Sequence, residues 1–145
     1  MAKKLIFAVL LVISLSVGLM LVKPKKQFTD GEVTSWLIAD RQLKVKLASS
    51  PASIERGLGG VTELGEVDGM LFIFNQPVKP IFWMKDMKFA IDLYWIKSGK
   101  IIGIEKNMLP PATDDDESLK KYYAPAFVDM VLEIPVSKNI QLYSE

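Results

Sequence analysis

Residues 5–22 form an apolar run in which only two serines and one glycine interrupt the hydrophobic side chains. Lysines precede this run at positions 3 and 4, and the sequence Lys-Pro-Lys-Lys follows it at residues 23–26. As a helix rising 1.5 Å per residue, the run spans about 27 Å, close to the thickness of the hydrocarbon core of a bilayer. The run therefore predicts a transmembrane helix and leaves the rest of the chain to fold as a separate domain.

Two other interpretations of this segment stay open. A cleaved signal peptide would place the cut near residues 14–16, but the mature chain would then begin with an apolar stub at residues 17–22. A buried core helix is the other possibility, although a helix that is apolar all round and flanked by lysines rarely belongs to so small a core. We predict an uncleaved signal anchor over residues 1–26, a linker over residues 27–32 and a folded domain over residues 33–145.

The short tail before the apolar run and the large domain after it are typical of an anchor whose N-terminus lies in the cytoplasm. We therefore expect a single-pass membrane protein that contacts the membrane through residues 5–22 and holds its domain on the extracytoplasmic side. Secretion after signal cleavage is the alternative.

The charge of the chain is divided unevenly. Its first 26 residues hold five lysines and no acid, so that 13 basic and 17 acidic side chains remain for the rest. A net charge of −4 and only two arginines, Arg41 and Arg56, make this part unsuited to binding nucleic acid.

The sequence contains no cysteine and no histidine. Their absence excludes disulfides, thiolate nucleophiles, Ser-His-Asp triads and metal sites built on sulfur or imidazole. Any catalysis would depend on carboxylates, lysines, tyrosines, hydroxyl groups or an oxygen-bound metal. We predict no catalytic residues, no metal site and no cofactor.

Short apolar stretches separated by turn signals fill the rest of the sequence. Leu43, Val45 and Leu47 alternate with polar residues, which is the period of a half-buried strand. Ser50 followed by Pro51 is typical of a helix start, and the three glycines within residues 57–60 limit this helix to a short one. The apolar stretches cover residues 33–39, 43–47, 70–74, 81–84, 91–96, 101–104, 126–134 and, more briefly, 140–143.

This pattern predicts an α+β, mostly β domain. We expect a compact barrel-like or sandwich-like arrangement of six to seven short strands with one or two short helices, preceded by the transmembrane helix. Residues 107–125, which contain two consecutive prolines and an acidic run, are expected to form a long exposed loop.

Several motifs resemble the family called domain of unknown function 192 (DUF192). They are DGMLFIF at residues 68–74, FWMK at 82–85, IDL at 91–93, PA at 125–126 and VLEI at 131–134. The resemblance covers about residues 33 to 136 and implies a compact β-rich fold, often exported or membrane-anchored, with no established reaction. Asp86 and Met87 stand where the family usually has Asn-Thr. If that pair belongs to a binding pocket, the resemblance implies an altered pocket here.

Charged side chains stand within or beside the apolar strands around Trp83, where burying them requires pairing or hydrogen bonds. A structural explanation is that Asp68 caps a turn and that Asp92 or Glu133 is paired. A functional explanation is a polar cleft in which an aromatic ring and carboxylates bind a sugar or a small polar ligand. We favour the structural explanation and keep the cleft as the hypothesis for a ligand site. Its candidate residues are Asp68, Trp83, Lys85, Asp86, Asp92 and Glu133.

Two further clusters offer weaker metal sites. The acidic run at residues 114–117 lacks the ligand spacing of a calcium-binding loop and is expected to be a solvated loop. Four methionines could suggest capture of a soft metal, but without cysteine or histidine beside them we interpret them as core residues. These are Met70, Met84, Met87 and Met130.

From these features we predict a membrane-tethered extracytoplasmic accessory or binding domain that is not an enzyme. Its expected partners are an envelope polymer, a small polar ligand or a membrane protein. The alternative is a carboxylate-based envelope hydrolase that acts on a sugar-like or small polar substrate through Asp92 or Glu133. A third possibility is a subunit of a membrane complex, since Ser14 and Gly18 supply one small-residue pair for helix packing.

Overall fold

A computed structural model describes residues 28–113, 115 and 117–143. The predicted anchor at residues 5–22, with its possible cleavage site, lies outside the described residues. Within them, no helix has both the length and the apolar character needed to cross a membrane.

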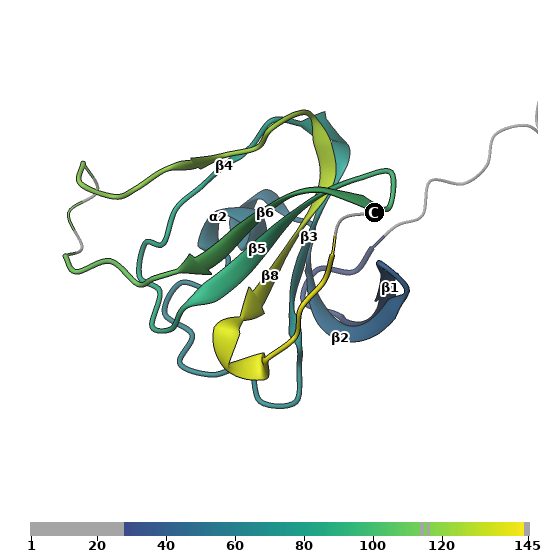
Figure 1. Ribbon diagram of the computed structural model, residues 1–145, viewed down its shortest axis with the longest axis horizontal. Coiled ribbons are helices and arrows are strands. Elements are labelled where there is room, and N and C mark those ends of the chain that lie inside the picture. The colour runs from purple at the N-terminus through teal and green to yellow at the C-terminus, as the bar shows by residue number, and fades with distance from the viewer. Residues whose placement is uncertain (1–27, 114, 116, 144–145) are drawn as a thin grey trace, which may run out of the picture.

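The described chain is mostly β, as expected, and forms a mixed sheet of six strands in the order β1-β2-β3-β8-β5-β6, together with a small two-stranded sheet of β4 and β7 (Figure 1). Strands β2 and β3 run parallel, and the other paired strands run antiparallel. The strands are β1 (Val33–Ile38), β2 (Arg41–Ala48), β3 (Gly69–Val78), β4 (Ile81–Phe82), β5 (Ile91–Lys97), β6 (Lys100–Met108), β7 (Tyr122–Tyr123) and β8 (Val128–Pro135). The helices are α2 (Pro51–Arg56) and a 3₁₀ turn at Val136–Lys138.

The helix predicted after Ser50 is confirmed. The Ser50 side chain accepts a hydrogen bond from the Ser53 backbone N–H, and the helix ends at Gly57, whose φ of 51° is a left-handed conformation. Because α2 stands between β2 and β3, it supplies the crossover that lets these two strands run parallel.

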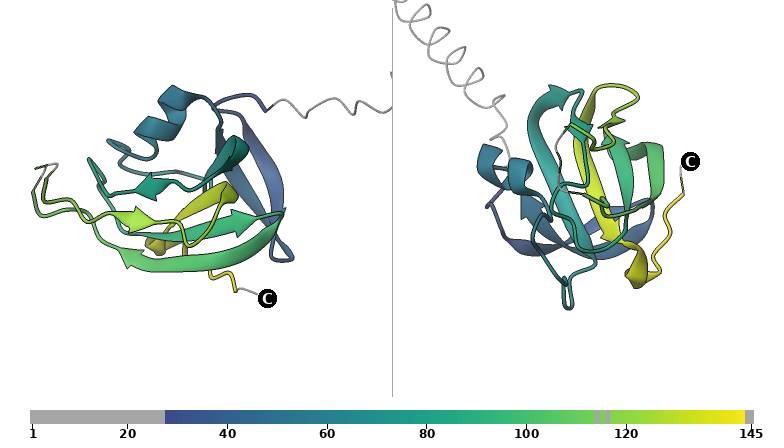
Figure 2. Two further views of the ribbon diagram at one scale, coloured as in Figure 1. Left: turned by 90° about the horizontal axis from the view of Figure 1, so that it is seen from above. Right: turned by 90° about the vertical axis from the view of Figure 1, so that its left-hand side faces the viewer.

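Three expectations need correction. The sheet is strongly curved but open, because β1 and β6 lie at its two edges, so the domain is not a closed barrel (Figure 2). The predicted loop over residues 107–125 contains β7, which pairs with β4 across a long stretch of sequence. Residues 140–143 form no strand and follow the 3₁₀ turn, which ends at Asn139 with a left-handed φ of 51°.

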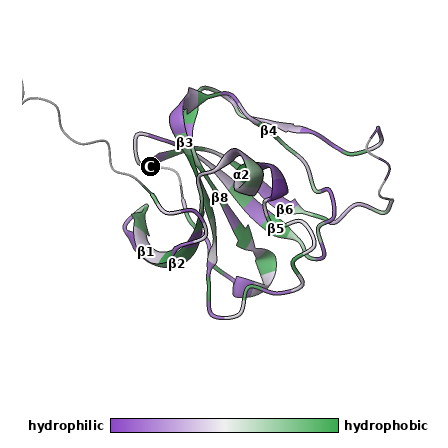
Figure 3. Cartoon of the chain, turned by 180° about the vertical axis from the view of Figure 1, so that it is seen from behind, coloured by the Kyte–Doolittle hydropathy of each residue, from purple (hydrophilic) through white to green (hydrophobic). Residues whose placement is uncertain are grey.

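Alternating side chains divide the core into two layers on opposite faces of the large sheet. Trp95 of β5 packs in one layer, here called the α2-side core, and Tyr94 packs in the other, the Tyr94-side core. Figures 2 and 3 show α2 lying over one face of the sheet. Glu133 shares the α2-side face of β8 with Val131, because residues two apart in a strand point the same way.

The segment that leads into the domain is attached to the start of α2 through Asp30. The Asp30 carboxylate accepts hydrogen bonds from the backbone N–H groups of Ser49, at 2.9 Å, and Ser50, at 3.1 Å. The hydroxyl groups of Ser50 and Ser53 donate to the same carboxylate. These bonds, led by the one from the Ser49 backbone, hold the pKa of Asp30 well below its usual value.

Candidate functional site

An open cavity of about 540 Å³ lies on the α2 side of the large sheet. Its walls come from α2 with the glycine-rich turn at residues 57–60, and from β4 with the following turn at residues 83–88. Phe72 of β3 and Glu133 of β8 form its floor. The cavity has the volume of a small-molecule site.

Backbone contacts hold the two walls together. The N–H of Gly60 donates a 3.0 Å hydrogen bond to the carbonyl of Asp86, a residue with a left-handed φ of 58°. A Cβ atom on Gly59 would lie 3.0 Å from the Arg56 carbonyl oxygen and 3.4 Å from the Lys85 carbonyl oxygen. Gly59 therefore permits the close approach of the two backbone segments that form the walls of the cavity.

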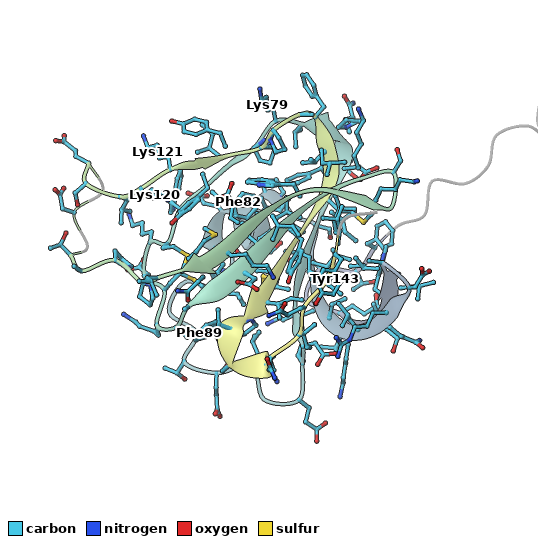
Figure 4. The ribbon with its side chains drawn as sticks, in the orientation of Figure 1. Lys79, Phe82, Phe89, Lys120, Lys121 and Tyr143 are labelled. Atoms are coloured by element: carbon cyan, nitrogen blue, oxygen red, sulfur yellow. The ribbon has the colours of Figure 1, made fainter. Side chains whose placement is uncertain are left out.

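Aromatic side chains make one wall of the cavity apolar. Phe82 meets the edge of Phe72 with ring centroids 5.1 Å apart, and it meets Trp95 at 5.6 Å. Trp83 lies at the mouth and is 44% exposed. Figure 4 labels Phe82 within the body of the domain, well away from Tyr143. The wall can stack against a flat apolar group.

Glu133 is the unusual residue of the floor. It is 4% exposed, and its Oε2 atom has no hydrogen-bond partner among the described residues. In β-sheet register it stands between Met70 of β3 and Leu93 of β5, so its strand neighbours are apolar. Burial in these surroundings raises the pKa of Glu133 to about 8. The carboxyl group is therefore mainly neutral at pH 7.

The mouth of the cavity carries charges of both signs. Arg56, Lys85 and Lys88 contribute positive charge, and Glu55 and Asp86 contribute negative charge. With Glu133 neutral, positive charge predominates around the cavity.

The structure brings four of the six candidate residues to this cavity: Trp83, Lys85, Asp86 and Glu133. Asp68 lies elsewhere, where its Oδ2 atom accepts a 2.8 Å hydrogen bond from the Lys44 backbone N–H. The Asp68 N–H donates in return to the Lys44 carbonyl oxygen at 2.7 Å. Asp68 thus secures the start of the parallel β2–β3 pair.

Asp92 is also separate from the cavity, because it lies on the Tyr94-side face of the sheet. Its Oδ2 atom accepts a 2.9 Å bond from Lys106 Nζ, and its Oδ1 atom accepts a 2.8 Å bond from the Asn107 N–H. Partial burial lowers the pKa of Lys106, but its bonds with Asp92 and Tyr94 outweigh that effect and leave the pKa raised. Asp92 and Glu133, the two acids named for a hydrolase, therefore point to opposite faces.

The contributions of Arg56, Lys88 and Phe72 to the cavity were not predicted from the sequence. The glycines at residues 57–60 were a usable signal, because three glycines after a short helix favour a close approach of two backbone segments. Phe72 gave no such signal, since it is one apolar residue within an apolar strand. Among the described residues, no group of three or more acidic side chains is placed to hold a metal ion.

Comparison with known proteins gives a family match. The family DUF192, described as "Uncharacterized ACR, COG1430", matches residues 35–139. No curated protein matches the sequence.

Two solved structures are similar to this one. A putative transcription regulator from Sinorhizobium meliloti 1021 has 26% sequence identity and a TM-score of 0.62, over 76% of this chain and 85% of its own. A protein of unknown function from Novosphingobium aromaticivorans DSM 12444 has 20% identity and a TM-score of 0.57, over 81% of this chain and 94% of its own. At this level of identity, the similarity to the Novosphingobium protein shows a shared fold and nothing about function.

Proposed function

Because this chain belongs to the DUF192 family, whose description names no activity, we propose from the cavity that it is a ligand-binding domain and not an enzyme. The observation that supports this function is Glu133, a buried carboxyl that lines an open cavity and whose Oε2 atom has no hydrogen-bond partner among the described residues. A buried polar group without a hydrogen bond costs about 1–3 kcal/mol. A ligand that supplies the missing bond would recover that free energy.

We further propose that the domain is tethered to the outer face of a membrane by residues 5–22. The apolar run and its flanking lysines support this arrangement. Protease treatment of intact spheroplasts tests it, with the size of the membrane-bound product read on the same gel. Degradation of a full-length chain from outside is the expected result, and protection of the domain would place it on the cytoplasmic side.

The hydrolase alternative receives little support from the cavity. Glycoside hydrolysis uses two carboxyl groups that flank the scissile bond. Glu133 is the buried acid of the cavity, while Glu55 and Asp86 are exposed at its mouth and Asp92 faces away. This arrangement fits recognition of a bound group better than a pair of cooperating acids.

The term transcription regulator belongs to the Sinorhizobium meliloti protein. We do not extend it to this chain, because 13 basic and 17 acidic side chains beyond residue 26 would repel the phosphates of DNA.

A fragment screen tests the binding function. The full chain, carrying ¹³C-methyl methionine, is titrated with small organic fragments while the methyl signals are followed by NMR. We expect hits to shift Met87, which lines the cavity, and to leave Met130, in the Tyr94-side core, unchanged.

Two variants localise the hits. Trp83→Ala removes an exposed wall of the cavity and should weaken binding about tenfold, whereas Tyr143→Ala removes a 74% exposed aromatic far from the cavity and should not. A screen without hits at Met87, or equal effects of the two variants, would reject the binding function.

A further inference from the structure

The charges around the cavity indicate what kind of ligand it accepts. Three basic side chains and two acidic ones lie at its mouth, on α2 and on the turn at residues 83–88. The strands that flank Glu133 place Met70 and Leu93 beside it, and neither carries charge. The nearest acid on β5, Asp92, points to the other face and is bonded to Lys106. The ionisable groups that share the cavity with Glu133 are therefore Glu55, Arg56, Lys85, Asp86 and Lys88.

The floor indicates which atoms of a ligand can reach it. The Oε2 atom of Glu133 lies 3.9 Å from the position that a Cβ on Gly57 would take, directly beneath the end of α2. That oxygen is buried and has no hydrogen-bond partner among the described residues. Phe72 and Phe82 line the space beside it. A ligand between the two walls would therefore have carbon on one side and the Glu133 carboxyl below, whose Oε2 atom has no partner among the described residues.

We propose that the cavity binds a small organic carboxylate, whose apolar part packs against Phe82 and Trp83 and whose anionic group lies between Glu133 and the basic side chains of the mouth. This inference rests on the proposed binding function and names its ligand class. A neutral Glu133 donates its O–H to the ligand carboxylate, and Arg56, Lys85 and Lys88 balance the negative charge. A phosphate dianion would bring a second negative charge to a floor made of Phe72 and one neutral carboxyl, which makes a carboxylate the better match.

The protonation of Glu133 makes this ligand class distinguishable from a cation. An anion binds to the neutral carboxyl, so its affinity falls as pH rises through about 8, the pKa of Glu133. A cationic ligand would pair with the ionised carboxylate, and its affinity would rise over the same range. The sign of the pH dependence therefore separates the two.

Three probes of nearly the same shape carry out the test: phenylacetate, phenylacetamide and phenethylamine. Each is titrated into the full chain in detergent micelles, and the Met87 methyl signal reports binding at pH 7 and pH 9. We expect phenylacetate to bind at least about tenfold more tightly than either analogue at pH 7. Its affinity should fall about tenfold at pH 9, where about one Glu133 in ten keeps its proton.

Variants separate the contribution of each group. Glu133→Gln retains a donor, so phenylacetate should bind within about threefold of its wild-type affinity and lose the pH dependence. Because this buried substitution could also affect folding, Lys88→Ala serves as a second variant at the exposed mouth. It should weaken phenylacetate about threefold to tenfold and leave phenylacetamide unchanged, while Lys97→Ala, outside the cavity, should change neither.

Each opposite result overturns the inference. Tighter binding of phenethylamine, strengthening with pH, would show that the cavity accepts cations. Equal binding of phenylacetate and phenylacetamide would show that ligand charge has no part. If no probe binds but the fragment screen still yields hits at Met87, the ligand class is wrong and the binding function stands. If the screen also fails, both proposals fail.

Discussion

Gly57 lies directly over Glu133, so that a Cβ atom at residue 57 would stand 3.9 Å from the Oε2 atom of the carboxyl. The same atom would stand 3.4 Å from Cζ of Phe72. Gly57 and Glu133 both line the cavity, and the Oε2 atom is buried there without a hydrogen-bond partner among the described residues. The contacts around this site, and those within the sheet that supports it, lead to four predictions.

Gly57→Ala should destabilise the domain by about 1–3 kcal/mol, because residue 57 has a φ of 51° and a ψ of −133°, a conformation that side chains disfavour. Urea unfolding followed by tryptophan fluorescence measures the change. Gly65→Ala is the matched control, since Gly65 also has a positive φ, of 56°, but open space around it. A cost for Gly57→Ala well below about 1 kcal/mol would show that residue 57 accepts a side chain in this conformation, and a cost above that of Gly65→Ala would be the part due to the contacts with Phe72 and Glu133.

Glu133→Gln should flatten the pH dependence of stability. Burial raises the pKa of Glu133 from 4.5 to about 8, so the folded state holds a proton that the unfolded state has released between these values. The contribution of Glu133 to wild-type stability is therefore fully present below pH 4.5 and is lost as pH rises toward 8, with a slope approaching about 1.4 kcal/mol per pH unit. Urea unfolding at several pH values measures both proteins. Identical pH profiles would mean that Glu133 has an ordinary pKa.

Asp92→Asn should lower stability by about 1 kcal/mol without affecting ligand binding. The substitution removes the negative charge that accepts the 2.9 Å bond from Lys106, whose side chain is 45% exposed, so the loss is modest. Thermal unfolding measures the stability, and the Met87 titration measures binding. A loss of binding in a folded Asp92→Asn protein would connect this face of the sheet to the cavity and revive the hydrolase alternative.

Asp30→Ala should detach the entry segment from the start of α2. The variant loses the bonds that Ser49, Ser50 and Ser53 donate to the carboxylate. Faster amide hydrogen exchange at residues 49–53 is the expected result, measured by mass spectrometry at neutral pH. Glu32→Ala, an exposed acid two residues away, is the control and should leave that exchange unchanged. Unchanged exchange in Asp30→Ala would show that the serines hold α2 by themselves.

Local patterns in the sequence predicted most of the large sheet and α2. Leu43, Val45 and Leu47 are buried as their alternation required, and Ser50 caps the helix. Strand β7 was missed because two residues give no periodicity and its partner β4 lies far away in the sequence.

The candidate site could be predicted only in part, because it depends on strand register. Trp83 and Lys85 are two residues apart in the sequence and were expected together. Asp92 and Glu133 were also grouped, but β5 pairs Leu93, not Asp92, with Glu133. A difference of one residue in register places a side chain on the other face of a sheet, and no local pattern records it.

The central position of β8 has a consequence for how the chain folds. Strand β8 follows the other seven strands of the described residues, yet it lies between β3 and β5 and joins the β1-β2-β3 half of the sheet to the β5–β6 hairpin. Until β8 arrives, both halves present unpaired strand edges, which are sites of aggregation. Contacts between residues so distant in sequence slow folding. A growing chain must therefore keep two half-sheets apart until β8 emerges, and loss of β8 would leave the halves unjoined.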